Sequence, residues 1–146
     1  MNNYETFHEV LVKLFNEIMD IEEKAIITEA FKDISNNDMH IIEAIGVEEP
    51  RNMSAVAKDL SVTVGTLTIA INNLVKKAYV KRVRSEKDRR VVLISLTEKG
   101  VRAYEHHRTF HEDMIKATLA DLNTEQTEIL VKALTNLSSF FKNYGK

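Results

Sequence analysis

Residues 61–97 have the sequence SVTVGTLTIAINNLVKKAYVKRVRSEKDRRVVLISLT, and its first part has the spacing of a helix-turn-helix. Apolar side chains recur every three or four positions between residues 64 and 77, which predicts a helix with one face in the core. Thr63 stands where it can cap that helix. A shorter helix is predicted just before it, over residues 53–60, with Asn52 as its cap. Two short helices joined by about three residues match helix-turn-helix geometry.

A β-hairpin is predicted directly after this unit. Residues 79–84 and 91–96 are rich in Val, Ile and Leu, as is typical of strands, and they flank the polar run 85–90. A hairpin that follows a helix-turn-helix is a wing. The sequence therefore predicts a winged helix-turn-helix over about residues 35–97.

Longer helices are predicted on both sides of the winged unit. Residues 4–27 have a broad apolar face, and residues 98–143 contain two further helices. Both terminal helices are more apolar than the winged unit alone requires, which predicts that they interlock with a second copy across a twofold axis. We expect one domain, 1–146, mainly α with a small β-hairpin wing and a loop at 48–52. The expected caps are Ser35 with Asp38, Asn52, Thr63, Thr97, and Asn123 with Gln126, and Gly46 is the expected stop of the second helix.

The composition excludes several classes of protein. The 146 residues are 44% apolar and 29% charged, which is typical of a globular chain. The absence of Cys excludes disulfides and thiolate metal sites. No apolar run approaches the ~18 residues of a membrane span, and the first residues, MNNYE, do not resemble a secretory signal. We therefore expect a soluble, cytoplasmic protein.

Positive charge is concentrated in one short segment. Residues 76–90 carry eight basic and two acidic side chains, so this segment is +6, whereas the rest of the chain is −8 because the total is −2. A basic segment on an acidic protein is typical of contact with a polyanion, although it also fits a solvated surface patch. Since the segment coincides with the end of the second helix and the wing, double-stranded DNA is the expected partner.

The predicted second helix presents short polar and apolar side chains on its outer face. Thr and Asn reach base edges, Asn is able to pair with adenine, and methyl groups contact thymine. No Lys or Arg lies between Lys58 and Lys76, which favours an A/T-weighted site. Arg at a hairpin tip suits a narrow minor groove, and Asp88 is either a partner that orients Arg90 or an ordinary turn residue. The candidate DNA-binding residues are Val64, Gly65, Thr66, Thr68, Ile69, Asn72, Asn73, Lys76, Lys77, Arg82, Arg84, Lys87, Asp88, Arg89 and Arg90.

Two of these segments resemble a known family. The run 88–100, DRRVVLISLTEKG, is similar to the wing signature of MarR-type winged helix-turn-helix regulators, and 61–68, SVTVGTLT, is similar to their recognition-helix pattern. The resemblance covers essentially the whole chain. It implies a homodimer on an inverted repeat, with Arg90 in the minor groove braced by Asp88. Ile69 departs from the Arg of many members, and Ala78 departs from a Gly helix stop.

Within this family the chain most resembles the FabT-type repressors of bacterial fatty-acid synthesis genes. The similar segments include 31–35, 63–66, 72–74 and 134–137. This resemblance implies long-chain acyl-acyl carrier protein as a corepressor, with the acyl chain in an apolar tunnel. Apolar residues at helical spacing are also what a plain core requires. The candidate pocket residues are Ile18, Ile21, Phe31, Ile42, Phe110 and Met114.

The histidines make zinc a second candidate ligand. His107 and His111 are spaced i, i+4, so their rings share one helix face, and with His40 they would suit zinc, as in zinc-responsive members of the family. Hydrogen-bonding or dimer-core histidines explain the same spacing, and we expect no resident cofactor. A small aromatic ligand is a further alternative.

Other classes of function are less well supported. An enzyme is not expected, because the sequence has no Gly-rich phosphate loop, nucleophile elbow or metalloprotease motif. A winged helix that binds protein and has no DNA affinity remains an alternative. That alternative predicts that charge reversal along residues 81–90 leaves function intact.

Overall fold

A computed structural model describes residues 2–26 and 31–144, apart from the side chains of Ile18, Met19, Glu22, Glu23, Ala25 and Ile26. Its contacts divide the chain into two compact units, Met1–Thr109 and Phe110–Lys146, with the division inside α5. The single domain expected from the sequence stays a prediction. In chain order the elements are α1 (Asn3–Ile26), α2 (Asn36–Ile45), β1 (Arg51–Asn52), α3 (Met53–Asp59), α4 (Val64–Lys76), β2 (Val80–Arg84), β3 (Val92–Leu96), α5 (Glu98–Leu119) and α6 (Thr124–Asn143).

The helix boundaries are set by the capping residues that the sequence predicts. Ser35 and Asp38 form a reciprocal capping box at the start of α2, and Asn123 forms another with Gln126 at the start of α6. Asn52 accepts a 2.7 Å hydrogen bond from the backbone of Ala55 at the start of α3. These caps are local in sequence, which is why the helices begin within about one residue of their predicted positions.

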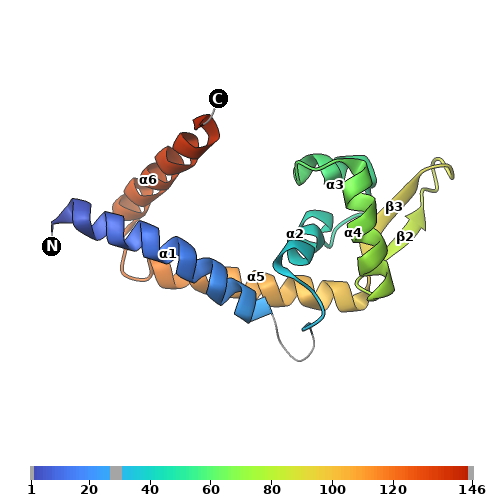
Figure 1. The fold of residues 1–146 in the computed structure, drawn as a ribbon, viewed down its shortest axis with the longest axis horizontal. Coiled ribbons are helices and arrows are strands. Elements are labelled where there is room, and N and C mark those ends of the chain that lie inside the picture. Colours follow the sequence, from blue (N-terminus) through green and yellow to red (C-terminus); the bar gives the residue numbers. More distant parts are fainter. Residues whose placement is uncertain (1, 27–30, 145–146) are drawn as a thin grey trace. The chain divides into compact units, whose positions relative to one another are not determined.

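The core of the N-terminal unit lies where α2, α3 and α4 meet the sheet and the start of α5 (Figure 1). Leu67, Ile71 and Leu74 of α4 are buried there, as their spacing predicts. They pack with apolar side chains of the neighbouring elements, among them Met39, Ile42, Ile45, Val56, Tyr79, Val80 and Ile94. This burial fixes which face of α4 is left in solvent.

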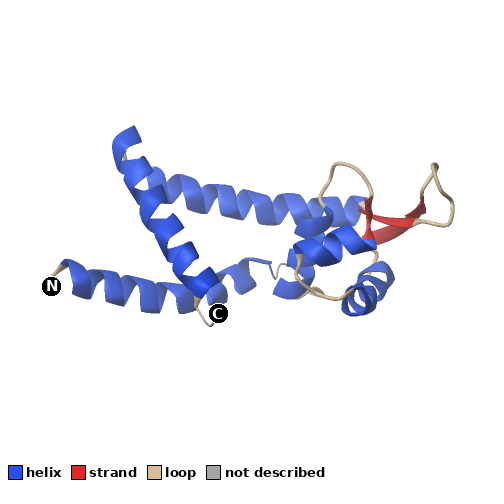
Figure 2. Ribbon diagram, turned by 90° about the horizontal axis from the view of Figure 1, so that it is seen from above, coloured by secondary structure: helices blue, strands red, loops and turns tan. Residues whose placement is uncertain are grey.

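The sheet has three strands, not the two that the sequence predicts. β2 and β3 form the expected antiparallel hairpin, with Val80 opposite Leu96 and Arg84 opposite Val92. β1 lies within the expected loop 48–52 and pairs with the other edge of β3, giving the order β1-β3-β2. Figure 2 draws the strands in red. The loop prediction was therefore wrong at its last two residues, because a two-residue strand is defined by its distant partner and has no periodicity of its own.

A tight junction joins the wing to α5. The carbonyl of Tyr79 accepts a 3.0 Å hydrogen bond from the backbone N–H of Thr97, and a Cβ at Gly100 would overlap that same carbonyl. Ala78, just before β2, has a φ of 68°, in the left-handed region. The chain thus leaves α4 through a conformation that glycine adopts more readily than alanine.

Large apolar side chains are exposed on α1 and, in the other unit, on α6. Tyr4, Phe7 and Phe15 of α1 are each at least half exposed. No residue of α6 is buried, and Phe140 and Phe141 are 57% exposed. Within the described part of the chain no single helix has the length and apolarity of a membrane span. The pair α3 and α4 reaches that threshold only when joined across a 105° bend.

Candidate nucleic-acid interface

The outer face of α4 carries most of the side chains that the sequence predicts to read DNA. Val64, Gly65, Thr66, Ile69, Asn72 and Asn73 are exposed, whereas Thr68 is half-buried. The Thr68 hydroxyl donates to the Val64 carbonyl at 2.8 Å, and Thr63 donates to the Thr66 hydroxyl oxygen at 3.0 Å. Ile69 is 74% exposed, which is unusual for a side chain of its size. The face is thus neutral, with short polar groups around one prominent apolar side chain.

Asn72 has a partner outside its own helix. The guanidinium of Arg82, on β2, donates a hydrogen bond from Nη2 to the Asn72 side-chain oxygen. Both residues are exposed. This bond connects the recognition face of α4 with the base of the wing.

The wing tip is held by hydrogen bonds within its own turn. The backbone N–H of Ser85 donates to the Val91 carbonyl, and that of Val91 donates to the Asp88 carbonyl. Arg84 contributes a further 2.8 Å hydrogen bond from its side chain to the Arg89 carbonyl. The backbone of the tip therefore has a defined conformation.

Asp88 and Arg90 form the two-point pair that the chemistry of the wing suggests. The Arg90 Nε donates to Asp88 Oδ1 at 3.0 Å, and Nη2 donates to Oδ2 at 3.1 Å. These side-chain bonds, with a further bond from the Arg90 backbone, hold the pKa of Asp88 below its ordinary value. The same pairing raises the pKa of Arg90. The Arg90 side chain stays 91% exposed, so the pair orients the guanidinium without covering it.

Most of the predicted cations lie at the surface, and one is turned inward. Lys76, Arg82, Arg84, Lys87, Arg89 and Arg90 are exposed. Lys77 is half-buried, and its ammonium group donates to the Asp33 carbonyl and lies 3.9 Å from Asp38 Oδ2. Lys77 therefore joins α4 to the segment before α2.

A polar cluster that sequence reasoning missed lies beneath this surface. The Tyr79 hydroxyl donates to Asp33 Oδ1 at 2.6 Å, and the Lys99 ammonium lies 4.3 Å from the centre of the Tyr79 ring and 3.8 Å from Asp33 Oδ2. The bond from Tyr79 is the main cause that lowers the pKa of Asp33. Burial, followed by the same bond, raises the pKa of Tyr79. Tyr79 and Asp33 are 46 positions apart, so no local sequence motif predicts their contact.

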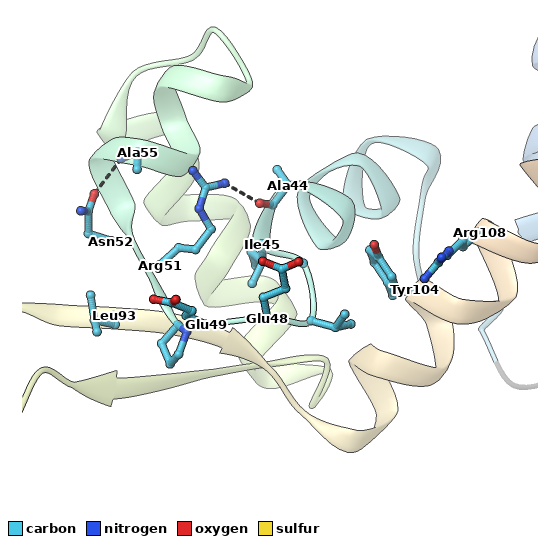
Figure 3. A pocket seen from close by; sticks show the side chains of 13 residues that line it. Ala44, Ile45, Glu48, Glu49, Arg51, Asn52, Ala55, Leu93, Tyr104 and Arg108 are labelled. Carbon is cyan, nitrogen blue, oxygen red and sulfur yellow. Dashed lines mark hydrogen bonds between the residues drawn. The ribbon is translucent and has the colours of Figure 1, made fainter.

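The N-terminal unit has a pocket of about 620 Å³ beside the loop that links α2 to β1 (Figure 3). Glu48 and Glu49 come from that loop, and Tyr104 and Arg108 come from α5. Arg51 donates to the Ala44 carbonyl at 2.6 Å and pairs with Asp59. The lining is rich in charged groups, which is unlike a tunnel for an acyl chain.

The six residues predicted to line a ligand pocket do not line this one. Phe31 and Ile42 are buried in the core of the N-terminal unit, and Ile21 of α1 is exposed. The side chain of Ile18 lies outside the described residues. In the C-terminal unit Phe110 is half-buried and Met114 is exposed. The acyl tunnel stays a prediction.

The histidines differ in their surroundings. His107 is 1% exposed, and its Nε2 lies 2.6 Å from Glu43 Oε1, so the two side chains link α5 to α2. His40 is exposed on α2, and His111 belongs to the C-terminal unit. Metal binding by these residues stays the alternative that the sequence left open, and structural histidines stay the prediction. Glu43, as a partner of His107, could not be chosen from sequence among the many acidic residues.

Comparison with known proteins agrees with this arrangement. The model of the family described as transcriptional regulator SarA/Rot matches residues 19–107. The regulator SarZ of Staphylococcus epidermidis is 32% identical over 108 residues, which cover 73% of this chain and 69% of SarZ. The regulator YpoP of Bacillus subtilis is 31% identical over 75 residues, which cover 51% of this chain and 53% of YpoP.

A solved structure shares the whole fold. The crystal structure of Streptococcus pneumoniae FabT in complex with DNA is similar with a TM-score of 0.83 and 40% identity, and the alignment covers 97% of this chain and 99% of that one. SarZ and YpoP are named as HTH-type transcriptional regulators, and the FabT chain carries the same fold. The chain belongs to the SarA/Rot and MarR-type family of winged-helix transcriptional regulators.

Proposed function

We propose that this regulator is a repressor that binds double-stranded DNA as a homodimer at an A/T-weighted inverted repeat. In this proposal α4 enters the major groove, the wing residues 85–90 contact the minor groove, and exposed cations between residues 76 and 90 neutralise phosphates. Long-chain acyl-acyl carrier protein acts as corepressor, and the regulated genes are those of fatty-acid synthesis.

The pairing of Asp88 with Arg90 carries the proposal. A solvated surface arginine gains little from a fixed direction, whereas an arginine that enters a narrow groove gains affinity if its guanidinium is held in advance. Asp88 holds the Nε and Nη2 edge of Arg90 at 3.0–3.1 Å and leaves the opposite edge for an acceptor. The neutral outer face of α4 and the cations on β2 belong to the same unit as the wing.

Exposed apolar side chains support the dimer. Phe7 and Phe15 of α1 are 64% and 50% exposed, and α6 separately exposes Ile129, Leu134 and Phe140. Monomeric proteins rarely leave large apolar groups together in solvent. A twofold axis formed by such helices would place two copies of α4 about one turn of DNA, ~34 Å, apart.

The fatty-acid role rests on likeness to FabT, at 40% identity over nearly the whole chain. Apolar side chains of the predicted pocket are compatible with an acyl chain, and the charged pocket beside Glu48 is not required for it. Zinc and small aromatic ligands are the alternatives that the experiment must separate from the acyl protein.

The test is a fluorescence anisotropy titration of a labelled duplex that contains an inverted repeat from a fatty-acid synthesis promoter. It is run in chelator, with and without long-chain acyl-acyl carrier protein, and with unacylated carrier protein as the control. We expect specific binding that tightens only with the acylated form. If the dimer neutralises ~6–10 phosphates, the affinity falls steeply and linearly on logarithmic axes as salt rises.

Two results would change the proposal. If specific DNA binding does not change with the acyl protein but changes when zinc is added in place of chelator, then zinc is the regulatory ligand and the acyl protein is not. Charge reversal of Lys81, Arg84 and Lys87 tests DNA binding itself. Regulation that survives this change would favour a winged helix that binds protein.

A further inference from the structure

The hydrogen bond between Arg82 and Asn72 determines which way the Asn72 amide points. A guanidinium has only donors, so the amide must turn its oxygen toward Arg82 and its NH₂ group away. Both side chains are exposed, and Asn72 lies on the outer face of α4. Asn72 therefore turns its two N–H donors away from Arg82, and one of the two lone pairs of its oxygen is occupied.

An asparagine in this state does not read adenine in the usual way. The specific pairing with adenine uses both ends of the amide, because the oxygen accepts from N6 and the NH₂ group donates to N7. Because Arg82 turns the oxygen toward β2 and occupies one of its two lone pairs, Asn72 presents mainly its donor end to the groove. The groups that match a lone donor are the acceptors of the major groove, namely thymine O4, guanine O6 and purine N7.

Ile69 selects among these acceptors. It lies three residues before Asn72 on the same helix face and is 74% exposed. Thymine is the base that shows an acceptor, O4, beside an apolar group, the C5-methyl. Guanine has acceptors without a methyl group, and its usual partners, Arg and Lys, do not occur between residues 59 and 75.

We propose that Arg82, although it lies outside the recognition helix, sets the base preference of Asn72, so that Ile69 and Asn72 together read thymine rather than adenine. This inference rests on the proposed DNA binding. Arg82 acts as a positioning residue, and Ile69 and Asn72 are the residues that contact the base.

The experiment begins with selection of bound sequences from a randomised duplex library by the natural chain. Each thymine of the selected half-site is then replaced singly by uracil, which lacks the methyl group, or by 5-methylcytosine opposite guanine, which keeps the methyl group and replaces O4 by a donor. Anisotropy titrations measure each duplex. At one thymine of each half-site we expect either replacement to weaken binding about 2- to 10-fold, the size of one net contact.

Variants of the protein show which residue causes the loss of affinity with uracil and which causes the loss with 5-methylcytosine. In Ile69→Ala the uracil penalty at that thymine disappears, and in Asn72→Ala the 5-methylcytosine penalty disappears. In Arg82→Met the amide is free to turn, so binding to adenine at that position improves relative to thymine. The matched control is Lys81→Met, which removes one exposed charge from the adjacent position of β2. It weakens all duplexes alike, as loss of a phosphate contact does.

The two failures are distinguishable. If the natural chain selects no sequence, the proposed DNA binding fails and the inference fails with it. If the chain selects a site, but Arg82→Met changes affinity uniformly as Lys81→Met does, then Arg82 does not orient Asn72. A 5-methylcytosine penalty that persists in Asn72→Ala would likewise overturn the assignment.

Discussion

The Tyr79 hydroxyl donates a 2.6 Å hydrogen bond to Asp33 Oδ1, and so joins the residue before β2 to the segment before α2. Tyr79 is fully buried, whereas the Asp33 side chain is 44% exposed. We expect Tyr79→Phe to lower the free energy of unfolding by about 1 kcal/mol, a charged hydrogen bond discounted for exposure. Urea denaturation measures this. An unchanged midpoint would show that the bond adds nothing to stability.

The same bond predicts a pH dependence. The pKa of Asp33 is lower in the folded chain than in the unfolded one, so its contribution is present above the ordinary aspartate pKa of 3.8 and is lost as the pH falls through the folded value. The difference in stability between the natural chain and Tyr79→Phe should therefore be largest near neutral pH. It should shrink as the pH falls below about 4. A difference that grows on acidification would contradict this account.

Ala78 occupies a conformation that suits glycine, with φ at 68°. We expect Ala78→Gly to stabilise the fold by up to about 1 kcal/mol, because the left-handed region costs a residue with a Cβ about that much. The control is Ala70→Gly, the same substitution inside α4, which should destabilise by a similar amount. Thermal unfolding of both variants measures whether each substitution raises or lowers stability. Destabilisation by Ala78→Gly would show that the backbone at Ala78 is not strained.

Gly100 is required by the contact between α5 and Tyr79. A methyl group at Gly100 would overlap the Tyr79 carbonyl oxygen, so Gly100→Ala should destabilise by at least about 2 kcal/mol. A methyl group at Gly65 in α4 would instead lie 3.9 Å from its nearest neighbour, the Thr63 hydroxyl oxygen, which is an ordinary contact. Gly65→Ala should therefore stabilise by a few tenths to about 1 kcal/mol. Denaturation curves that place the two variants in the opposite order would be inconsistent with this packing.

Arg90 should contribute strongly to DNA affinity. We expect Arg90→Ala to cost roughly 1–3 kcal/mol of binding per subunit, the size of a good specific arginine contact. The control is Arg102→Ala on α5, which removes the same charge from an arginine that pairs with Glu98 one turn away. Equal losses for the two variants in anisotropy titrations would reduce Arg90 to a general electrostatic role.

Asp88→Asn separates direction from charge. Removing this carboxylate makes the wing more positive, which by itself would strengthen attraction to DNA. It also weakens the two-point hold on Arg90. We expect weaker binding to the specific site and stronger binding to unrelated duplex. Tighter binding to both duplexes would mean that Asp88 is an ordinary turn residue.

Local signals account for what the sequence predicted correctly. The caps at Ser35, Asn52 and Asn123 involve partners three residues away, so the chain's own order reveals them. The buried face of α4 follows from helical spacing. The separation of Asp88 and Arg90 by two residues left a pair and an ordinary turn residue both open, the family resemblance implied the pair, and the structure shows it. The family resemblance rested on the same contiguous segments.

Features that depend on distant partners could not be predicted in this way. β1 exists because Arg51 lies opposite Ile94, and nothing in residues 48–52 indicates that edge. Asn72 was predicted to face DNA, but the state of its amide depends on Arg82 ten residues later on another element. The placement of Tyr79 over Asp33 is likewise a product of tertiary packing.

The pair of Asp88 and Arg90 also separates two kinetic roles in the proposed complex. Beyond the ~8 Å over which physiological salt screens charge, the pair is close to neutral and exerts little pull on an approaching duplex. Association would then be steered by the exposed charges of Lys76, Lys81, Lys87 and Arg89. Arg90 acts only at contact range, so joint replacement of Asp88 by Asn and Arg90 by Ala, which removes both charges, should shorten the lifetime of the bound state and leave the encounter rate nearly unchanged. Arg90→Ala alone leaves the Asp88 carboxylate behind and should also slow the encounter.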